Sequence, residues 1–90
     1  MVRYHIIVHG RVQGVGFRYH VQLHAGYNGI TGWVRNNEDG TVEVDAEGEE
    51  KNMDKFIAAV KKGNHFSKID FVDIEKIDRL EGYRNFRIKY

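Results

Sequence analysis

Three glycines in seven residues, between Gly10 and Gly16, open a segment that could hold an anion. Glycine adopts positive φ angles at little cost, and such angles let successive backbone N–H groups point into one concavity. Phe17, Val21 and Ala25 recur every four residues, which predicts a helix directly after the loop. The unpaired amides and positive dipole end of a helix start favour phosphate or sulfate. The junction is therefore either a tight turn or an anion cradle.

Arg18 lies about one residue inside this predicted helix, where its guanidinium could make a two-pronged contact with the same anion. The loop differs from the common nucleotide loops. A P-loop requires a lysine after its last glycine, and no lysine precedes Lys51. The dinucleotide fingerprint would require a third glycine where Tyr19 stands. The chain has no cysteine, which excludes a thiolate nucleophile and thiolate zinc sites.

The formal net charge of +1 conceals a division along the chain. Residues 1–37 contain four arginines and neither Asp nor Glu, whereas residues 38–54 contain eight acids and one lysine. The basic first part suits a small anion, but four arginines are too few to indicate nucleic acid. Because the acids alternate along a predicted strand and begin a helix, we interpret them as a solvated face.

Changes in hydrophobic period divide the chain into the elements that must position this loop. Val2–His9 alternates with a period of two and predicts a half-buried strand. Asp39-Gly40 predicts a hairpin turn, and the apolar phase slips between Phe71 and Val72, which predicts a β-bulge. The other predicted elements are strands over 30–35, 41–47, 69–77 and 86–90 and helices over 17–25 and 49–62.

The order of these elements is β-α-β-β-α-β with a short extra strand at the C-terminus. It predicts an α+β fold, a two-layer ferredoxin-like sandwich with a mainly antiparallel sheet and both helices on one face. The extra strand is expected at the sheet edge. Ninety residues without an internal linker predict one domain, residues 1–90. No apolar run approaches the roughly 18 residues of a membrane span, and no leader opens the chain, so we expect a cytoplasmic monomer without membrane contact.

Two motifs resemble the signatures of the acylphosphatase family. Residues 10–18, Gly-Arg-Val-Gln-Gly-Val-Gly-Phe-Arg, resemble the first signature. Residues 32–43, Gly-Trp-Val-Arg-Asn-Asn-Glu-Asp-Gly-Thr-Val-Glu, resemble the second signature. The chain length, the order of the elements and the aromatic end of the last strand also resemble this family. The resemblance therefore covers almost the whole chain.

This resemblance implies an enzyme that hydrolyses the carboxyl–phosphate anhydride of an acyl phosphate to a carboxylate and inorganic phosphate, without metal or cofactor. It implies that Arg18 binds the phosphate and that Asn36 orients the attacking water. Inorganic phosphate, as the product, is then expected to inhibit competitively. The implied cradle consists mainly of the backbone amides of Arg11, Val12, Gln13, Gly14, Val15, Gly16 and Phe17.

The implied chemistry is plausible on independent grounds. A carboxylate leaves readily without a general acid, so fixed donors for the phosphoryl oxygens are the main requirement. An arginine stays protonated at any useful pH, and an asparagine offers both an acceptor and a donor to fix a water. Neither Arg18 nor Asn36 needs a shifted pKa, and we therefore expect little pH dependence around neutrality.

Other side chains suggest alternatives that we consider weaker. His20 and His24 have a spacing that can bind zinc, but no acid lies nearby to complete the site, so we expect no metal. RNA-recognition domains share the topology, yet the acidic third strand would repel a nucleic-acid backbone, so we expect no nucleic acid. A further alternative is a module that binds acyl or carbamoyl phosphate for another protein without useful turnover.

Two positions depart from the pattern of the family. Asn28 stands where an apolar anchor is expected after the first helix. Gly63-Asn64-His65 replaces a frequent Gly-Pro after the second helix. Both departures predict reduced local rigidity, and neither concerns the implied site.

Overall fold

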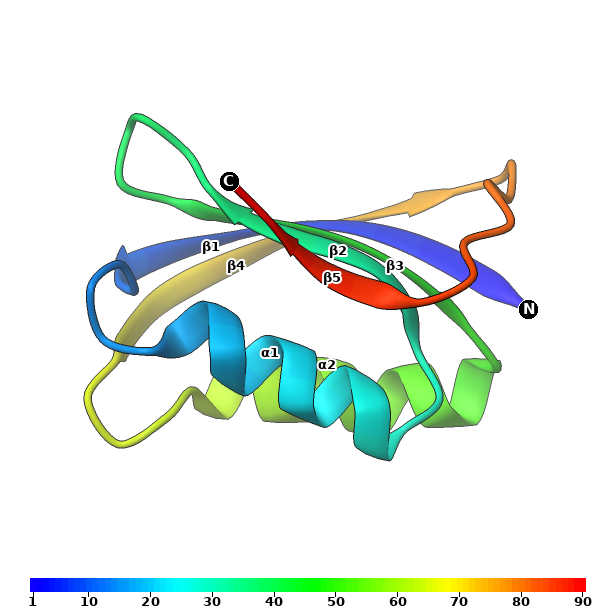
Figure 1. Cartoon of the computed structure of the whole chain (residues 1–90), viewed down its shortest axis with the longest axis horizontal. Helices are drawn as coiled ribbons and strands as arrows, with labels where there is room; N and C mark the ends of the chain where they lie inside the picture. The colour runs from blue at the N-terminus through cyan, green and yellow to red at the C-terminus, as the bar shows by residue number, and fades with distance from the viewer.

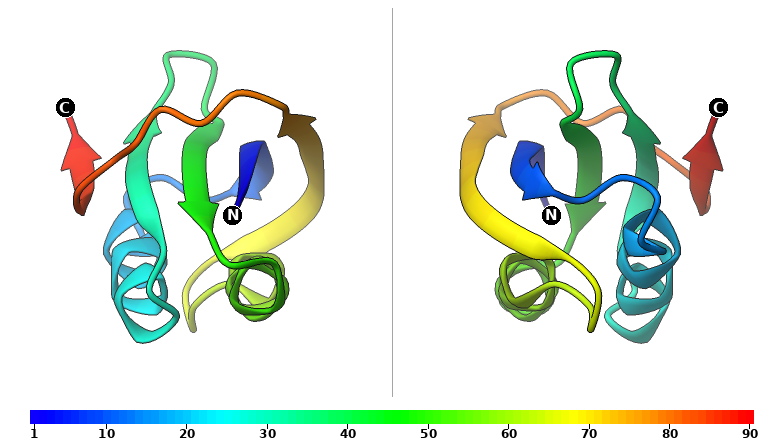
Figure 2. Two further views of the ribbon diagram at one scale, coloured as in Figure 1. Left: turned by 90° about the vertical axis from the view of Figure 1, so that its right-hand side faces the viewer. Right: turned by 90° about the vertical axis from the view of Figure 1, so that its left-hand side faces the viewer.

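The chain forms seven elements in the predicted order. The computed structural model describes all residues from Met1 to Tyr90. Its elements are β1 (Val2–Arg11), α1 (Phe17–Tyr27), β2 (Thr31–Asn36), β3 (Val42–Gly48), α2 (Glu50–Lys62), β4 (Lys68–Ile77) and β5 (Phe86–Lys89). Both helices lie on the same side of one sheet (Figures 1 and 2). The predicted two-layer α+β sandwich is confirmed.

The sheet has five strands in the order β4-β1-β3-β2-β5. Strand β1 pairs antiparallel with β3 and with β4, and β2 pairs antiparallel with β3. The short strand β5 lies at the edge and pairs parallel with β2. The predicted C-terminal edge strand is thus confirmed, and it brings the last residues of the chain beside α1 (Figure 1).

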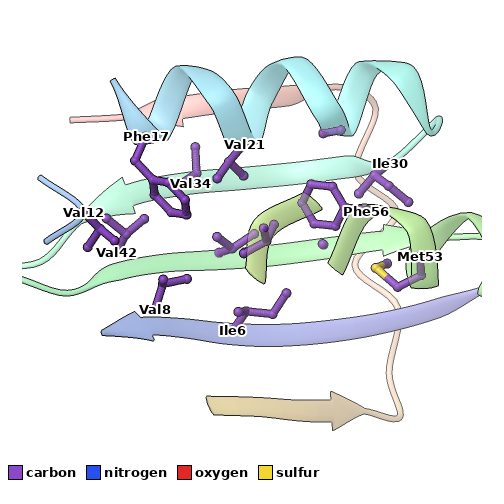
Figure 3. Close-up of a cluster of buried hydrophobic side chains, with 14 residues drawn as sticks. Ile6, Val8, Val12, Phe17, Val21, Ile30, Val34, Val42, Met53 and Phe56 are labelled. Carbon is purple, nitrogen blue, oxygen red and sulfur yellow. The ribbon is translucent and has the colours of Figure 1, made fainter. Parts of the chain in front are cut away.

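The core fills the space between the sheet and the two helices and consists of 14 buried apolar residues (Figure 3). Helix α1 contributes Phe17, Val21 and Ala25, the residues that its four-residue spacing selects. Helix α2 contributes Met53, Phe56 and Val60. Full burial of one such large side chain contributes about 1.5–3 kcal/mol, so these stripes fix both helices to the sheet. No helix has the length and apolar character of a membrane span.

A bulge interrupts the pairing of β1 with β4, one position away from the predicted place. His9 pairs with Phe71 but Gly10 pairs with Ile69, which leaves Asp70 as the extra residue. The prediction between Phe71 and Val72 was therefore wrong in position. A Cβ at Gly10 would lie 2.1 Å from the carbonyl oxygen of Lys68, and its φ is +136°, so the close approach requires glycine. The bulge lets β1 continue to Arg11, close to the glycine loop.

The prediction of a solvated acidic face was wrong for two of the acids. Asp45 and Glu47 are each only 2% exposed. The segment between β4 and β5 passes over the face of the sheet opposite the helices (Figure 2). Arg3 forms an ion pair with Asp45 at 2.8 Å, and this hydrogen bond raises the pKa of Arg3. Alternation along a strand shows which face a residue occupies, but it does not show that a loop covers that face.

Candidate active site

The loop between β1 and α1 is fastened to the core by its apolar side chains. Val12 and Phe17 are each 1% exposed, and Val15 packs against the core cluster. Figure 3 shows Val12 and Phe17 at one end of the core, beside Val34 and Val42. Because these side chains point inward, the intervening backbone is held at the surface at the same end of the sheet.

The backbone amides of this loop have no partner within the chain. No N–H group from Val12 to Phe17 donates to a carbonyl or a side chain. Gly14 and Gly16 have φ angles of +73° and +77°, in the left-handed region that glycine adopts without strain. Gly16 is also the N-cap of α1 and provides no side-chain cap. A run of free amides at a helix start favours the anion cradle over a tight turn.

Arg18 faces a cavity of about 290 Å³ beside this loop. The lining residues are Val12, Gly14, Gly16, Phe17, Arg18, Tyr19, Ile88 and Tyr90. The guanidinium carbon of Arg18 lies 5.1 Å from the centroid of the Tyr90 ring, a cation–π arrangement. Arg18 takes part in no ion pair of the chain. Its positive charge is therefore not neutralised by a carboxylate.

Gln13 connects the loop to the turn between β2 and β3. Its Nε2 atom donates to the carbonyl oxygen of Asn37 at 2.8 Å and to that of Thr41 at 2.9 Å. Within the turn, the hydroxyl and the amide of Thr41 donate to Asp39, and these hydrogen bonds lower the pKa of Asp39. The Gln13 side chain thus holds the glycine loop against the end of β2.

Asn36 occupies that end of β2. The predicted strand ended at residue 35, but Asn36 pairs with Val42 as the last residue of β2. It lies on the same face of the sheet as Val34, toward the helices, because successive side chains alternate. Its Oδ1 atom is buried and has no hydrogen-bond partner in the chain. A buried polar atom without a partner in the chain is uncommon, so this oxygen can accept a hydrogen bond from a bound water or ligand.

The structure brings together most, but not all, of the predicted site residues. Arg18 and four loop residues line one cavity, namely Val12, Gly14, Gly16 and Phe17. Arg11 lies in β1 opposite Lys68, with its side chain exposed, and does not line the cavity. The Gln13 side chain donates to the turn between β2 and β3, and the Val15 side chain packs against the core. Asn36 lies at the end of the neighbouring strand β2.

Sequence reasoning missed two contributions to this region. Tyr90 was not among the predicted site residues, but its ring lies against Arg18. The aromatic end of the last strand was the signal that could have identified it. Asn64, in the loop between α2 and β4, donates from Nδ2 to the carbonyl oxygen of Val15 at 2.7 Å. No local pattern indicates this contact, because the two residues are 49 positions apart.

The histidines of α1 serve the contact between the helices. The Nε2 atom of His20 lies 3.0 Å from the carbonyl oxygen of Ala59 in α2. The centroids of the His20 and His24 rings are 4.5 Å apart. Burial lowers the pKa of His24, and electrostatic repulsion from the neighbouring His20 and Lys62 side chains lowers it further.

Comparison with known proteins gives one consistent result. A model of the acylphosphatase family matches residues 4–88. The chain belongs to the acylphosphatase family. Among its relatives is the acylphosphatase of Bacillus licheniformis, 52% identical over 90 residues that cover 100% of both chains. The crystal structure of acylphosphatase from Bacillus subtilis is similar with a TM-score of 0.97 and 49% identity, over 100% of both chains. The prediction of a hydrolase of this family is confirmed.

The family fold also occurs inside a much larger protein. The crystal structure of full-length HypF in the phosphate- and nucleotide-bound form is similar with a TM-score of 0.91 and 33% identity. The match covers 99% of this chain and 12% of that one. The same fold is therefore used both in a chain of this length and as a small part of a longer one.

Proposed function

We propose that this chain hydrolyses acyl phosphates by direct attack of water, with the phosphate held by Arg18 and the backbone amides of residues 11–17. The observation that carries the proposal is the run of free amides from Val12 to Phe17 beside an arginine without a carboxylate partner. Backbone amides and a guanidinium are the donors that suit the oxygens of a phosphate.

These donors supply what the reaction needs. In phosphoryl transfer, negative charge spreads over the three non-bridging oxygens, and catalysis depends on donors already in place. The loop is fixed from behind by Val12, Phe17 and the Gln13 side chain, so its amides need no rearrangement when the phosphate binds. The Tyr90 ring adds a cation–π contact to the guanidinium of Arg18.

The attacking water is held by Asn36 in this proposal. The unpartnered Oδ1 atom of Asn36 would accept a hydrogen bond from the water. The water oxygen forms a bond to phosphorus while the bond between phosphorus and the carboxylate oxygen breaks. The carboxylate leaves with the electron pair, and the proton of the water passes to the phosphate or to solvent. The scheme requires neither a metal nor a cofactor.

The test is the hydrolysis of an aromatic acyl phosphate, followed by ultraviolet absorbance, in the wild type and in Arg18→Ala and Asn36→Ala. We expect each variant to lose on the order of 10²–10³ in kcat/KM, the typical cost of removing a positioned donor. Arg18→Ala should also weaken competitive inhibition by inorganic phosphate, whereas Asn36→Ala should bind phosphate normally and turn over slowly. This split separates phosphate binding from activation of the water.

Two exposed residues that do not line the cavity of Arg18 provide matched controls. Arg84 and Asn85 precede β5, have exposed side chains and form no side-chain hydrogen bond or ion pair. Arg84→Ala and Asn85→Ala should keep the wild-type rate and the wild-type phosphate inhibition. Unchanged rates in both Arg18→Ala and Asn36→Ala would overturn the proposal.

A second function, a module that binds acyl or carbamoyl phosphate without turnover, is favoured by the match to a small part of HypF. The same assay separates the two functions. A module would bind phosphate in an Arg18-dependent manner and hydrolyse no acyl phosphate at any concentration.

The monomeric state and the cytoplasmic location are also part of our proposal. Sedimentation and cell fractionation test them.

A further inference from the structure

Asn64 is held rigidly behind the glycine loop. Its backbone is fixed by Ser67, whose Oγ atom accepts from the N–H of Asn64 at 2.9 Å and donates to its carbonyl oxygen at 3.1 Å. Its Nδ2 atom donates to the carbonyl oxygen of Val15 at 2.7 Å. Its Oδ1 atom is buried without a partner. The opposite amide orientation would place Oδ1 against the Val15 carbonyl oxygen, so this contact fixes the orientation shown.

The bond to Val15 determines where the next amide points. The peptide between Val15 and Gly16 is trans, because the chain has no cis peptide bonds. In a trans peptide the C=O and N–H bonds point in opposite directions. With the carbonyl turned toward Asn64, the N–H of Gly16 points away from Asn64. Gly16 itself lines the cavity of Arg18.

The alternative orientation of this peptide is sterically accessible. A flip of this peptide changes ψ of Val15 and φ of Gly16, and glycine at 16 adopts either sign of φ without a steric cost from Cβ. A flip would turn the carbonyl oxygen of Val15 toward the phosphate and turn one amide donor away from it. Such a state would repel an anion.

We propose that Asn64 is a positioning residue for the phosphate cradle, because it holds the peptide between Val15 and Gly16 in the orientation that binds an anion. This inference rests on the proposed function of the loop. Asn64 replaces a residue of the frequent Gly-Pro pattern, and the sequence predicted lost rigidity there. The contact with Val15 provides rigidity in a different way, through one hydrogen bond between distant loops.

This role has a distinct kinetic signature. If only a fraction of molecules has the binding orientation, every phosphate-containing ligand binds more weakly by that same fraction. Removal of the Asn64 amide should therefore raise KM and the phosphate inhibition constant by one common factor. At saturation the bound molecules have the correct orientation, so kcat stays unchanged. Loss of one neutral hydrogen bond, about 1 kcal/mol, changes the equilibrium between the two peptide orientations about fivefold, so the common rise in KM and in the inhibition constant is at most about fivefold.

The experiment compares Asn64→Ala, Asn64→Asp and the control Asn85→Ala, with kcat, KM, phosphate inhibition constant and melting temperature measured for each. Both Asn64 variants should show the parallel rise in KM and inhibition constant at neutral pH. Asn85→Ala should match the wild type. A change in KM and inhibition constant below about 1.5-fold would overturn the inference, and so would a fall in kcat at unchanged KM.

The variant Asn64→Asp also tests the donor directly. At neutral pH its carboxylate has no proton to donate to the Val15 carbonyl oxygen. As the pH falls through about 4, the carboxyl group gains a proton that can restore the bond. Its KM, divided by the wild-type KM at the same pH, should then return toward one. A ratio that does not change with pH would refute the proposed donor role.

Failure of this inference differs from failure of the proposed function. If Arg18→Ala leaves phosphate inhibition unchanged, the cradle itself is wrong. If Arg18→Ala weakens inhibition while both Asn64 variants behave like Asn85→Ala, the cradle stands and only the role of Asn64 is overturned. A merely structural role would lower the melting temperature of Asn64→Ala without the parallel change in the two constants, and this outcome also overturns the inference.

Discussion

The buried carboxylate of Glu47 is predicted to hold the segment between β4 and β5 in place. Its two oxygens accept hydrogen bonds from the backbone N–H groups of Glu81, Gly82 and Tyr83, with the last two at 3.0 and 3.4 Å. The side chain is among the fully buried ones of the protein. We therefore choose Glu47→Gln, which keeps the shape and removes the charge.

The size of the effect follows from these contacts. The amide oxygen of Gln can still accept from two N–H groups, but its NH₂ group would face a third donor. One hydrogen bond to a charged acceptor is then lost, worth about 1.5–3 kcal/mol, and the relief of burying a charge offsets part of it. We expect a loss of about 2 kcal/mol in the free energy of unfolding. For a domain of this length, the melting temperature should fall by roughly 10 °C.

Urea unfolding followed by tryptophan fluorescence measures this loss. The single tryptophan, Trp33, donates from Nε1 to the Tyr83 hydroxyl at 3.2 Å and so reports on the same segment. The control is Glu75→Gln, because the side chain of Glu75 is exposed in β4 and forms no hydrogen bond or ion pair. Its free energy of unfolding should stay within about 0.5 kcal/mol of the wild type. A Glu47→Gln loss equal to that of the control would refute the anchoring role.

Three further predictions concern α1. Because the pKa of His24 is lowered in the folded state, the neutral ring stabilises the fold fully above the unfolded pKa of about 6.5, and this stabilisation is lost as the pH falls below it. His24→Gln should therefore reduce the fall in melting temperature below about pH 6.5. Asn28→Leu should lower the melting temperature, because Asn28 is only half-buried and its Nδ2 donates to the His24 carbonyl oxygen at 2.9 Å. Gly26→Ala should raise stability by up to about 1 kcal/mol in urea unfolding, because an added Cβ meets nothing within 4 Å.

The fold was predictable because local periods and long-range packing agree. The four-residue spacing of Phe17, Val21 and Ala25 is the buried stripe of α1. The placement of the bulge was less accurate, since the extra residue is decided by the partner strand. The close approach of the Gly10 backbone to Lys68 determines which residue of β4 is the extra one. The sequence of one strand alone does not predict this contact with the partner strand.

The candidate site was predictable where its chemistry lies in one continuous segment. The glycine loop and Arg18 are adjacent in sequence, so their types and spacing carry the inference. Asn36 was identified from a resemblance, and its unpartnered Oδ1 atom supports the prediction without testing it. Tyr90 and Asn64 reach the loop from other parts of the chain. Contacts of this kind depend on the tertiary fold, and no spacing in the sequence encodes them.

The two departures from the family pattern, which predicted lost rigidity, have a common physical form. Asn28 donates to the carbonyl oxygen of His24, and Asn64 donates to that of Val15. In each case a side-chain amide donates to a backbone carbonyl oxygen, at the end of α1 for Asn28 and in the glycine loop for Asn64. Rigidity at these positions therefore comes from a hydrogen bond rather than from an apolar anchor or a proline ring.

The sheet separates the acids from the anion site. In β3 the acids occupy alternate positions, so their side chains lie on the face opposite the helices and the cavity of Arg18. There they have partners of their own: burial alone would raise the pKa of Glu43, but hydrogen bonds with His5 and Arg35 hold it below its ordinary value. Each of these carboxylates thus has hydrogen-bond partners on its own face of the sheet, away from Arg18. A shift of β3 by one residue would reverse this arrangement and put acids beside the site, so the strand register protects the phosphate-binding charge.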